Sequence, residues 1–165
     1  MLTATILISP VQEADWLTLK NIRLASLRDS PKAFGMTLAA ASSHSQAQWR
    51  ERAASPRARF FLANVQGRAV GLIGVTAIVD GDCELIAMWV RPAARGSGVA
   101  AMLVGAVKDA AIAGGARRVN LAVAPDNLAA SRLYQRQGFR FLPAFEALTS
   151  DPAITLQKMA WTVVA

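Results

Sequence analysis

Cysteine is almost absent from this sequence, which has a single one, Cys83, among its 165 residues. One thiol excludes an intramolecular disulfide and a multi-cysteine metal site, so we expect no metal centre and a reducing compartment. Long hydrophobic runs are missing too, because Arg, Asp or Gly interrupts each apolar stretch well before the roughly 18 residues that a membrane span needs. The first residues, MLTATILISP, lack the basic start of a signal peptide. These absences predict a cytoplasmic protein with no membrane contact.

Acidic residues are the scarcer charged class, with 11 Asp and Glu against 18 Lys and Arg, which gives a net charge of +7. A basic surface attracts anions such as nucleic acid or a phosphorylated small molecule. The basic residues are scattered along the chain, whereas nucleic-acid binding needs a clustered stripe of them. We therefore expect no nucleic-acid partner, and a basic nucleic-acid binder stays as a third functional hypothesis.

Periodicity predicts one domain, residues 1–165, in which strands and helices alternate. Asp80-Gly81 and Gln66-Gly67 lie between apolar runs and predict hairpins, so the central strands should form an antiparallel meander. Strands are predicted at 4–9, 59–65, 69–79, 83–90, 117–124, 139–142 and 154–164, and helices at about 13–28, 43–54, 99–113 and 127–137. The result is a mixed α/β (α+β) fold, with a largely antiparallel sheet of six to seven strands, about four helices and a long loop near 142–154.

A glycine turn joins the strand at 83–90 to the helix at 99–113. The free N–H groups and positive dipole end of such a helix favour a bound anion. Residues 96–101, GSGVAA, satisfy the dinucleotide pattern G-x-G-x-x-G/A, but the next strand holds no acidic residue and three antiparallel strands precede the turn. A Walker-type phosphate loop is excluded because no Lys-Ser or Lys-Thr follows. The turn alone leaves a plain loop, a dinucleotide turn and another anion cradle open.

Two stretches resemble signatures of the GNAT superfamily of acetyl-CoA-dependent N-acetyltransferases. RGSGVA, residues 95–100, is similar to its pyrophosphate-binding motif Q/R-x-x-G-x-G/A, and MWVRPAA precedes it in the manner of that family. LAVAPDNLAASRLYQRQGF, residues 121–139, is similar to its second motif, with Asn127, Ala130, Leu133, Tyr134, Gly138 and Phe139 in register. The resemblance covers both motifs in the right order, and it implies a GNAT-like fold that binds the pyrophosphate of coenzyme A at the glycine turn.

The resemblance also implies roles for particular residues. Tyr134 would direct its hydroxyl at the coenzyme A sulfur as general acid, and Glu84 would deprotonate the amine, often through water. The strand that holds Met88, Trp89 and Val90 would splay from the next one and bind the pantetheine arm with its backbone, with one N–H as oxyanion donor. The remaining cofactor contacts would come from Arg95, Gly96, Ser97, Gly98, Val99, Ala100 and Asn127.

Three of these residues also have a purely structural interpretation. Tyr134 and Trp89 could be core residues, and Glu84 could be an ordinary exposed acidic residue of a strand. Acceptor specificity would belong to the first two helices, residues 28–37 and the 142–154 loop, which contain no acidic cluster for a polycationic acceptor. The leading hypothesis is direct transfer of an acetyl group from acetyl-CoA to a primary amine of an unidentified small molecule or protein. The runner-up is a non-catalytic acyl-CoA-binding regulatory module, and a homodimer stays open.

Overall fold

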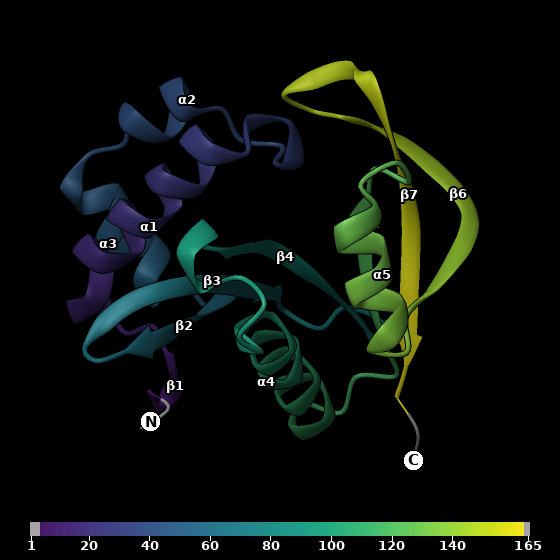
Figure 1. Ribbon diagram of the computed structural model, residues 1–165, viewed down its shortest axis with the longest axis horizontal. Coiled ribbons are helices and arrows are strands. Elements are labelled where there is room, and N and C mark those ends of the chain that lie inside the picture. The colour runs from purple at the N-terminus through teal and green to yellow at the C-terminus, as the bar shows by residue number, and fades with distance from the viewer. Residues whose placement is uncertain (1–3, 164–165) are drawn as a thin grey trace.

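A computed structural model describes residues 4–163, which form a mixed α/β domain around a seven-stranded sheet of order β1-β2-β3-β4-β5-β7-β6 (Figure 1). The strands are β1 (Ile6–Pro10), β2 (Ala58–Val65), β3 (Arg68–Thr76), β4 (Asp82–Val90), β5 (Arg118–Val123), β6 (Arg140–Leu148) and β7 (Asp151–Thr162). The helices are α1 (Trp16–Asp29), α2 (Leu38–Ser42), α3 (Gln46–Ala54), α4 (Val99–Ala113) and α5 (Leu128–Arg136), with short 3-10 turns at Glu13–Asp15, Pro31–Ala33 and Pro92–Ala94. The predicted fold class is confirmed. Val164, the end of the strand predicted at 154–164, lies outside the described residues.

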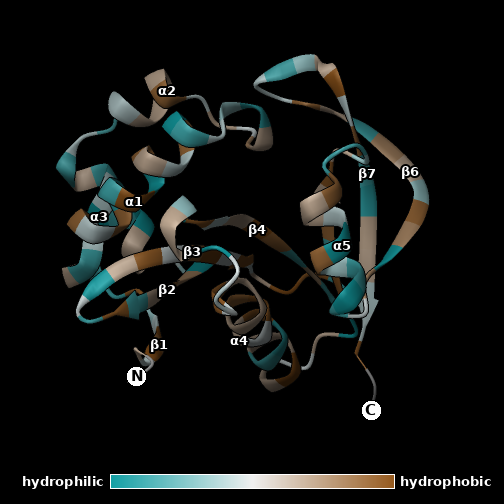
Figure 2. Cartoon of the chain, viewed as in Figure 1, coloured by the Kyte–Doolittle hydropathy of each residue, from teal (hydrophilic) through white to brown (hydrophobic). Residues whose placement is uncertain are grey.

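Helices cover the sheet on both faces and create two hydrophobic cores. On one face, α4 packs Leu103 and Val107 against β3, β4 and β5, together with Tyr134 and Phe139 from the α5 region. On the other face, α1 and α3 pack Leu19, Leu27 and Trp49 against Leu72 and Trp89 of the central strands. Hydrophobic residues colour most of β3 and β4 brown in Figure 2, as expected for strands buried on both faces.

The turn residues take the backbone conformations that their sequence predicts. Asp80 and Gly81 have φ angles of 51° and 83°, and Gln66 and Gly67 have 52° and 76°, so both pairs lie in the left-handed region that tight hairpins need. The β2–β3 and β3–β4 pairs are antiparallel, which confirms the meander.

One sequence prediction about the secondary structure is wrong, and one short helix was missed. The long loop expected near 142–154 is instead a hairpin, because β6 and β7 continue to a turn at Thr149 and Ser150. Pro143 is tolerated because β6 is an edge strand and its register to β7 shifts between Phe141 and Phe145. The helix predicted at 43–54 is α3, which Ser45 caps, whereas the short α2, which Thr37 caps, was not predicted.

The sheet opens between β4 and β5, its parallel pair of neighbours. Their register covers only three residues of each strand, from Asp82 opposite Arg118 to Glu84 opposite Asn120. Beyond this point β4 turns toward α1 while β5 stays with β7 (Figure 1). The splay that the family resemblance implies is therefore confirmed, and it leaves one backbone edge of β4 without a neighbouring strand.

Candidate active site

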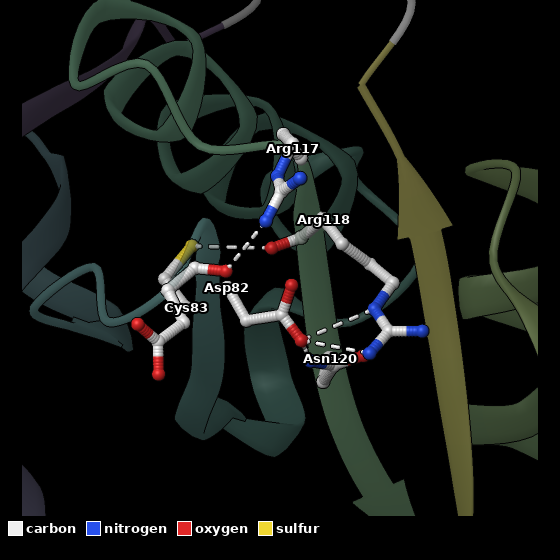
Figure 3. A network of polar contacts seen from close by, with 6 residues as sticks. Asp82, Cys83, Arg117, Arg118 and Asn120 are labelled. Carbon is white, nitrogen blue, oxygen red and sulfur yellow. Dashed lines mark hydrogen bonds and ion pairs between the residues drawn. The ribbon is translucent and has the colours of Figure 1, made fainter.

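Polar side chains fasten the closed end of the β4–β5 splay (Figure 3). Arg118 donates from Nε and Nη2 to Asp82 Oδ2, at 3.2 and 2.8 Å, and Asn120 Nδ2 donates to the same oxygen at 3.1 Å. These donors hold the pKa of Asp82 below its usual value. Arg117 reaches across to the Asp80 carbonyl at 2.9 Å. The fastening fixes where the two strands separate and hence where the opening begins.

A bulge in β4 lies on the open part of the splay. Leu72 pairs with Trp89 and Gly74 with Ile86, so Ala87 and Met88 face only one β3 residue and have no registered partner. Ala87 has a φ of 58°, in the left-handed region that a residue with a β-carbon rarely adopts. The bulge turns the backbone of Met88 at the place where the resemblance puts an oxyanion donor.

A cleft of about 1090 Å³ passes through this opening and is lined from both faces of the sheet. Met88 lies on its β4 wall, and Asn127 and Tyr134 approach from α5. Arg23 and Phe34 close the side near α1, and Glu146 lies on β6. Ligands that enter from opposite faces of the sheet can therefore meet at the splay.

Tyr134 is almost fully buried, with 7% of its surface exposed, and its ring makes an edge contact with Phe139 at 5.8 Å between centroids. Tyr134 lines the cleft, and its hydroxyl donates to no described residue. Burial raises the pKa of the phenol above its usual value, so the group keeps its proton. The core interpretation fits the ring, and the functional one fits a hydroxyl on the wall of the cleft that donates to no described residue.

Glu84 stands where β4 leaves β5, and its carboxylate lines the cleft. Partial burial raises its pKa first, and the negative charge of Glu146 raises it further, while Lys158 acts in the opposite direction. Glu146 was not predicted from the sequence, because it is brought beside Glu84 by the β6–β7 hairpin, which was predicted to be a loop. A carboxylate with a raised pKa beside an open cleft is suited to act as a base.

The glycine turn is exposed and shaped for close approach by a ligand. Gly96 and Gly98 have φ angles of 80° and 88°, and a β-carbon on either would meet no heavy atom within 4 Å. The first α4 amide that bonds within the helix is that of Met102, to the Gly98 carbonyl at 3.2 Å. The N–H groups of Val99 and Ala100 precede it at the positive end of the helix dipole. The turn therefore fits a phosphate group.

The side chains of Arg95 and Asn127 both form hydrogen bonds within the protein. Arg95 Nε donates to the Val90 carbonyl at 3.0 Å, and its Nη2 forms an ion pair with Asp29 at 2.7 Å. Asn127 Oδ1 accepts from the Ala130 amide at 3.3 Å, which confirms the predicted helix cap. The Ser97 hydroxyl donates to the Ala94 carbonyl. All three side chains thus bond to the protein itself and support the backbone around the site.

Asp29, at the end of α1, was not expected from the sequence, yet it joins the two halves of the site. Its Oδ2 accepts from Trp89 Nε1 at 2.9 Å, Ser30 Oγ at 2.8 Å and Arg95 Nη2. The Trp89 bond is the largest cause of a pKa lowered to about 2, followed by the bonds from Ser30 and Arg95. The Trp89 ring lies in the α1-side core, so any contact of this residue with cofactor would come from its backbone.

The cleft has a roof where the α1–α2 segment meets the β6–β7 turn. Ser150 Oγ donates to the Phe34 carbonyl at 2.6 Å, and Thr149 lies beside Gly35. Figure 1 shows the tip of the β6–β7 hairpin bent toward the turn after α1. Residues 28–37 and the hairpin thus enclose the same end of the cleft, as the resemblance implies for the acceptor side.

Comparison with known proteins decides the family. The acetyltransferase (GNAT) family model matches residues 20–139. The chain belongs to the GNAT acetyltransferase family. An uncharacterized N-acetyltransferase of Mycobacterium tuberculosis is 35% identical over 96 residues, which are 58% of this chain and 62% of that protein. The match thus spans less than two thirds of the relative's length. A counterpart in Mycobacterium bovis matches equally.

Solved structures share the GNAT fold at low sequence identity. A GNAT acetyltransferase from Streptococcus pneumoniae superposes with a TM-score of 0.80 at 21% identity, over 97% of this chain and all of the other. The Salmonella typhimurium protein yncA, solved with its cofactor acetyl-CoA, gives a TM-score of 0.75 at 18% identity, over 99% of this chain and 96% of that one. No helix formed by residues 4–163 is long and apolar enough to cross a membrane.

Proposed function

We propose that this GNAT protein transfers an acetyl group from acetyl-CoA to a primary amine of an unidentified small molecule or protein. The observation that carries the proposal is the cleft at the β4–β5 splay, which brings the Tyr134 hydroxyl and the Glu84 carboxylate to one space. Membership of the family and the exposed glycine turn support acetyl-CoA as the acetyl donor.

The cofactor would be held along the open side of the splay. Backbone N–H groups of residues 96–100 would bind the pyrophosphate, since the helix dipole and the space above Gly96 and Gly98 favour an anion there. The free edge of Met88, Trp89 and Val90 would pair with the pantetheine amides as an added strand does. Asn127, exposed at the α5 cap, would add a polar contact.

Acetyl-CoA supplies an acetyl thioester, whose carbonyl carbon accepts the amine nitrogen and whose C–S bond breaks. Glu84 would take the proton that the amine loses, directly or through a water molecule. The Met88 backbone at the bulge would donate to the developing oxyanion. Tyr134 would give its hydroxyl proton to the sulfur that leaves. The raised pKa values of both side chains suit these roles, because the phenol stays protonated and the carboxylate becomes more basic.

Thiol release tests the proposal. The protein is incubated with acetyl-CoA and a panel of primary amines, and free coenzyme A is measured against a control without amine. We expect amine-dependent release and a melting temperature that rises with acetyl-CoA concentration. Stabilisation by acetyl-CoA without release from any amine would instead support a non-catalytic acyl-CoA-binding module, and stabilisation by NAD but not by coenzyme A would overturn the cofactor assignment.

The proposal includes a cytoplasmic location for this activity. Cys83 is the single cysteine of the chain and forms no disulfide, which supports a reducing compartment. The protein's partners are acetyl-CoA and the amine acceptor. A homodimer is compatible with the proposal and is not required by it.

A further inference from the structure

Arg23, in the middle of α1, is a cation without a counterion among residues 4–163. Its guanidinium lines the cleft and lies over the Phe34 ring, 4.8 Å from the centroid. Its Nη1 atom is fully buried and has no hydrogen-bond partner, and no described carboxylate forms an ion pair with it. A buried charge that is left unpaired costs free energy, so such a group is expected to have a partner that the chain itself does not supply.

The surroundings of Arg23 add positive rather than negative charge. Arg52 is close enough to lower the pKa of Arg23, which burial and this like charge together bring to about 10. The nearest cleft acid along the chain, Asp29, is already occupied by Trp89, Ser30 and Arg95. Arg23 therefore brings an uncompensated positive charge to the α1 end of the cleft, and Arg52, which does not line the cleft, adds to that charge.

The opposite charge dominates the other end of the same cleft. The negative charge of Glu146 raises the pKa of Glu84 there, and neither carboxylate forms an ion pair with Arg23. Arg23 lies against Phe34, which packs in the cluster of Trp89 and Ala87, and Glu84 lies in the first half of β4. The cleft is thus polarised, with carboxylates near the proposed amine site and an unpaired guanidinium away from it.

We propose that Arg23 binds a carboxylate of the acceptor, so that the substrates are amines which also carry a carboxylate, as amino acids do. This inference rests on the proposed acetyltransferase function. The planar guanidinium fork matches a carboxylate in two parallel hydrogen bonds, and the Phe34–Ser150 contact covers this end of the cleft. The ammonium end of the same molecule is attracted to Glu84 and Glu146.

Matched amine pairs test the inference. The three pairs are 3-aminopropanoate with propylamine, 4-aminobutanoate with butylamine, and 6-aminohexanoate with hexylamine. We expect kcat/KM for the carboxylate member to be about tenfold to a hundredfold higher in at least one pair, mainly through KM. Arg23→Met should abolish this preference and leave the neutral amines unchanged, and Arg23→Lys, which keeps the charge but loses the fork, should retain part of it.

Binding of the products gives a second readout that needs no turnover. Calorimetry on protein saturated with coenzyme A compares 4-acetamidobutanoate with N-butylacetamide, and the preference for the former should disappear in Arg23→Met. Arg68→Met is the matched control, since Arg68 is exposed at the start of β3 and outside the cleft. The free Arg23→Met protein should also melt at or above the wild-type temperature, because an unpaired buried charge is removed.

Three outcomes overturn the inference: no carboxylate preference in either readout, a preference that survives Arg23→Met, or an equal loss with charged and neutral amines, which would make Arg23 structural. Failure of the proposed function has a different signature. In that case the wild-type protein releases no coenzyme A with neutral amines either, and acetyl-CoA does not raise its melting temperature.

Discussion

Replacing Tyr134 with phenylalanine removes one oxygen atom from the site and little else. The ring would keep its place in the core and its edge contact with Phe139. Tyr134 lines the cleft and its hydroxyl donates to no described residue, so its removal leaves no acceptor unpaired. We therefore expect the free energy of unfolding to change by less than about 1 kcal/mol, whereas truncation of the ring to alanine would cost about 3–5 kcal/mol.

The rate of acetyl transfer should respond very differently. If Tyr134 gives its proton to the departing sulfur, Tyr134→Phe loses about 10²-fold or more in rate, which corresponds to about 2.7 kcal/mol of activation free energy. Burial raises the pKa of the phenol, so the hydroxyl of the wild-type protein stays protonated throughout the range of about pH 6 to 9. The loss should accordingly be the same at every pH in that range.

The assay is a single-turnover measurement with acetyl-CoA bound and amine in excess, which isolates the chemical step from product release. Ser131→Ala is the matched control, because Ser131 is also buried on α5, also lacks a hydrogen-bond partner and lies outside the cleft. That variant should react at the wild-type rate. Wild-type speed in Tyr134→Phe would refute the proposed acid role and leave the residue as a packing group.

Three further changes probe the base, the glycine turn and the link between α1 and β4. Glu84→Gln should lower kcat/KM about 10²-fold near neutral pH, and the difference should vanish at low pH, where the wild-type carboxylate is protonated; parallel pH profiles would contradict this. Gly98→Val should weaken coenzyme A binding in titrations and cost about 1–3 kcal/mol of stability, because φ is 88°; unchanged affinity would count against the turn as the pyrophosphate site. Asp29→Asn should destabilise by about 1 kcal/mol at pH 7 in urea unfolding. Because the folded pKa of Asp29 is lowered to about 2, the stabilisation exists above its unfolded pKa of 3.8 and disappears as the pH falls through 2, so a constant difference would be contrary evidence.

Local signals predicted those parts of the fold that depend on neighbours in the sequence. The Asp80-Gly81 hairpin, the apolar face of α4 and the Asn127 cap each follow from a few adjacent residues, and all three are confirmed. The β6–β7 hairpin was missed because Pro143 and Pro152 argue against strands locally. Pro143 is acceptable because β6 is an edge strand with a register shift there, and Pro152 because it precedes the part of β7 that pairs with β5.

The candidate site divides in the same way. Motif residues such as Tyr134 and the glycine turn were expected, and the structure places Tyr134 and Glu84 around one cleft, although their roles stay predictions. Arg23 and Asp29 could not be predicted, because one is defined by the absence of a partner and the other by bonds to residues 60 and more positions away. Such features exist only after the chain has folded.

The buried thiol of Cys83 can report on opening of the protein structure in a thiol assay. The side chain is 3% exposed on β4, beside the point where β4 and β5 separate, and burial raises the pKa of its thiol. A reagent that detects thiolates will therefore register released coenzyme A against a quiet background from the folded protein. The same reagent will react with Cys83 once the seam between β4 and β5 opens, so its slow phase measures how often the closed end of the splay comes apart in solution.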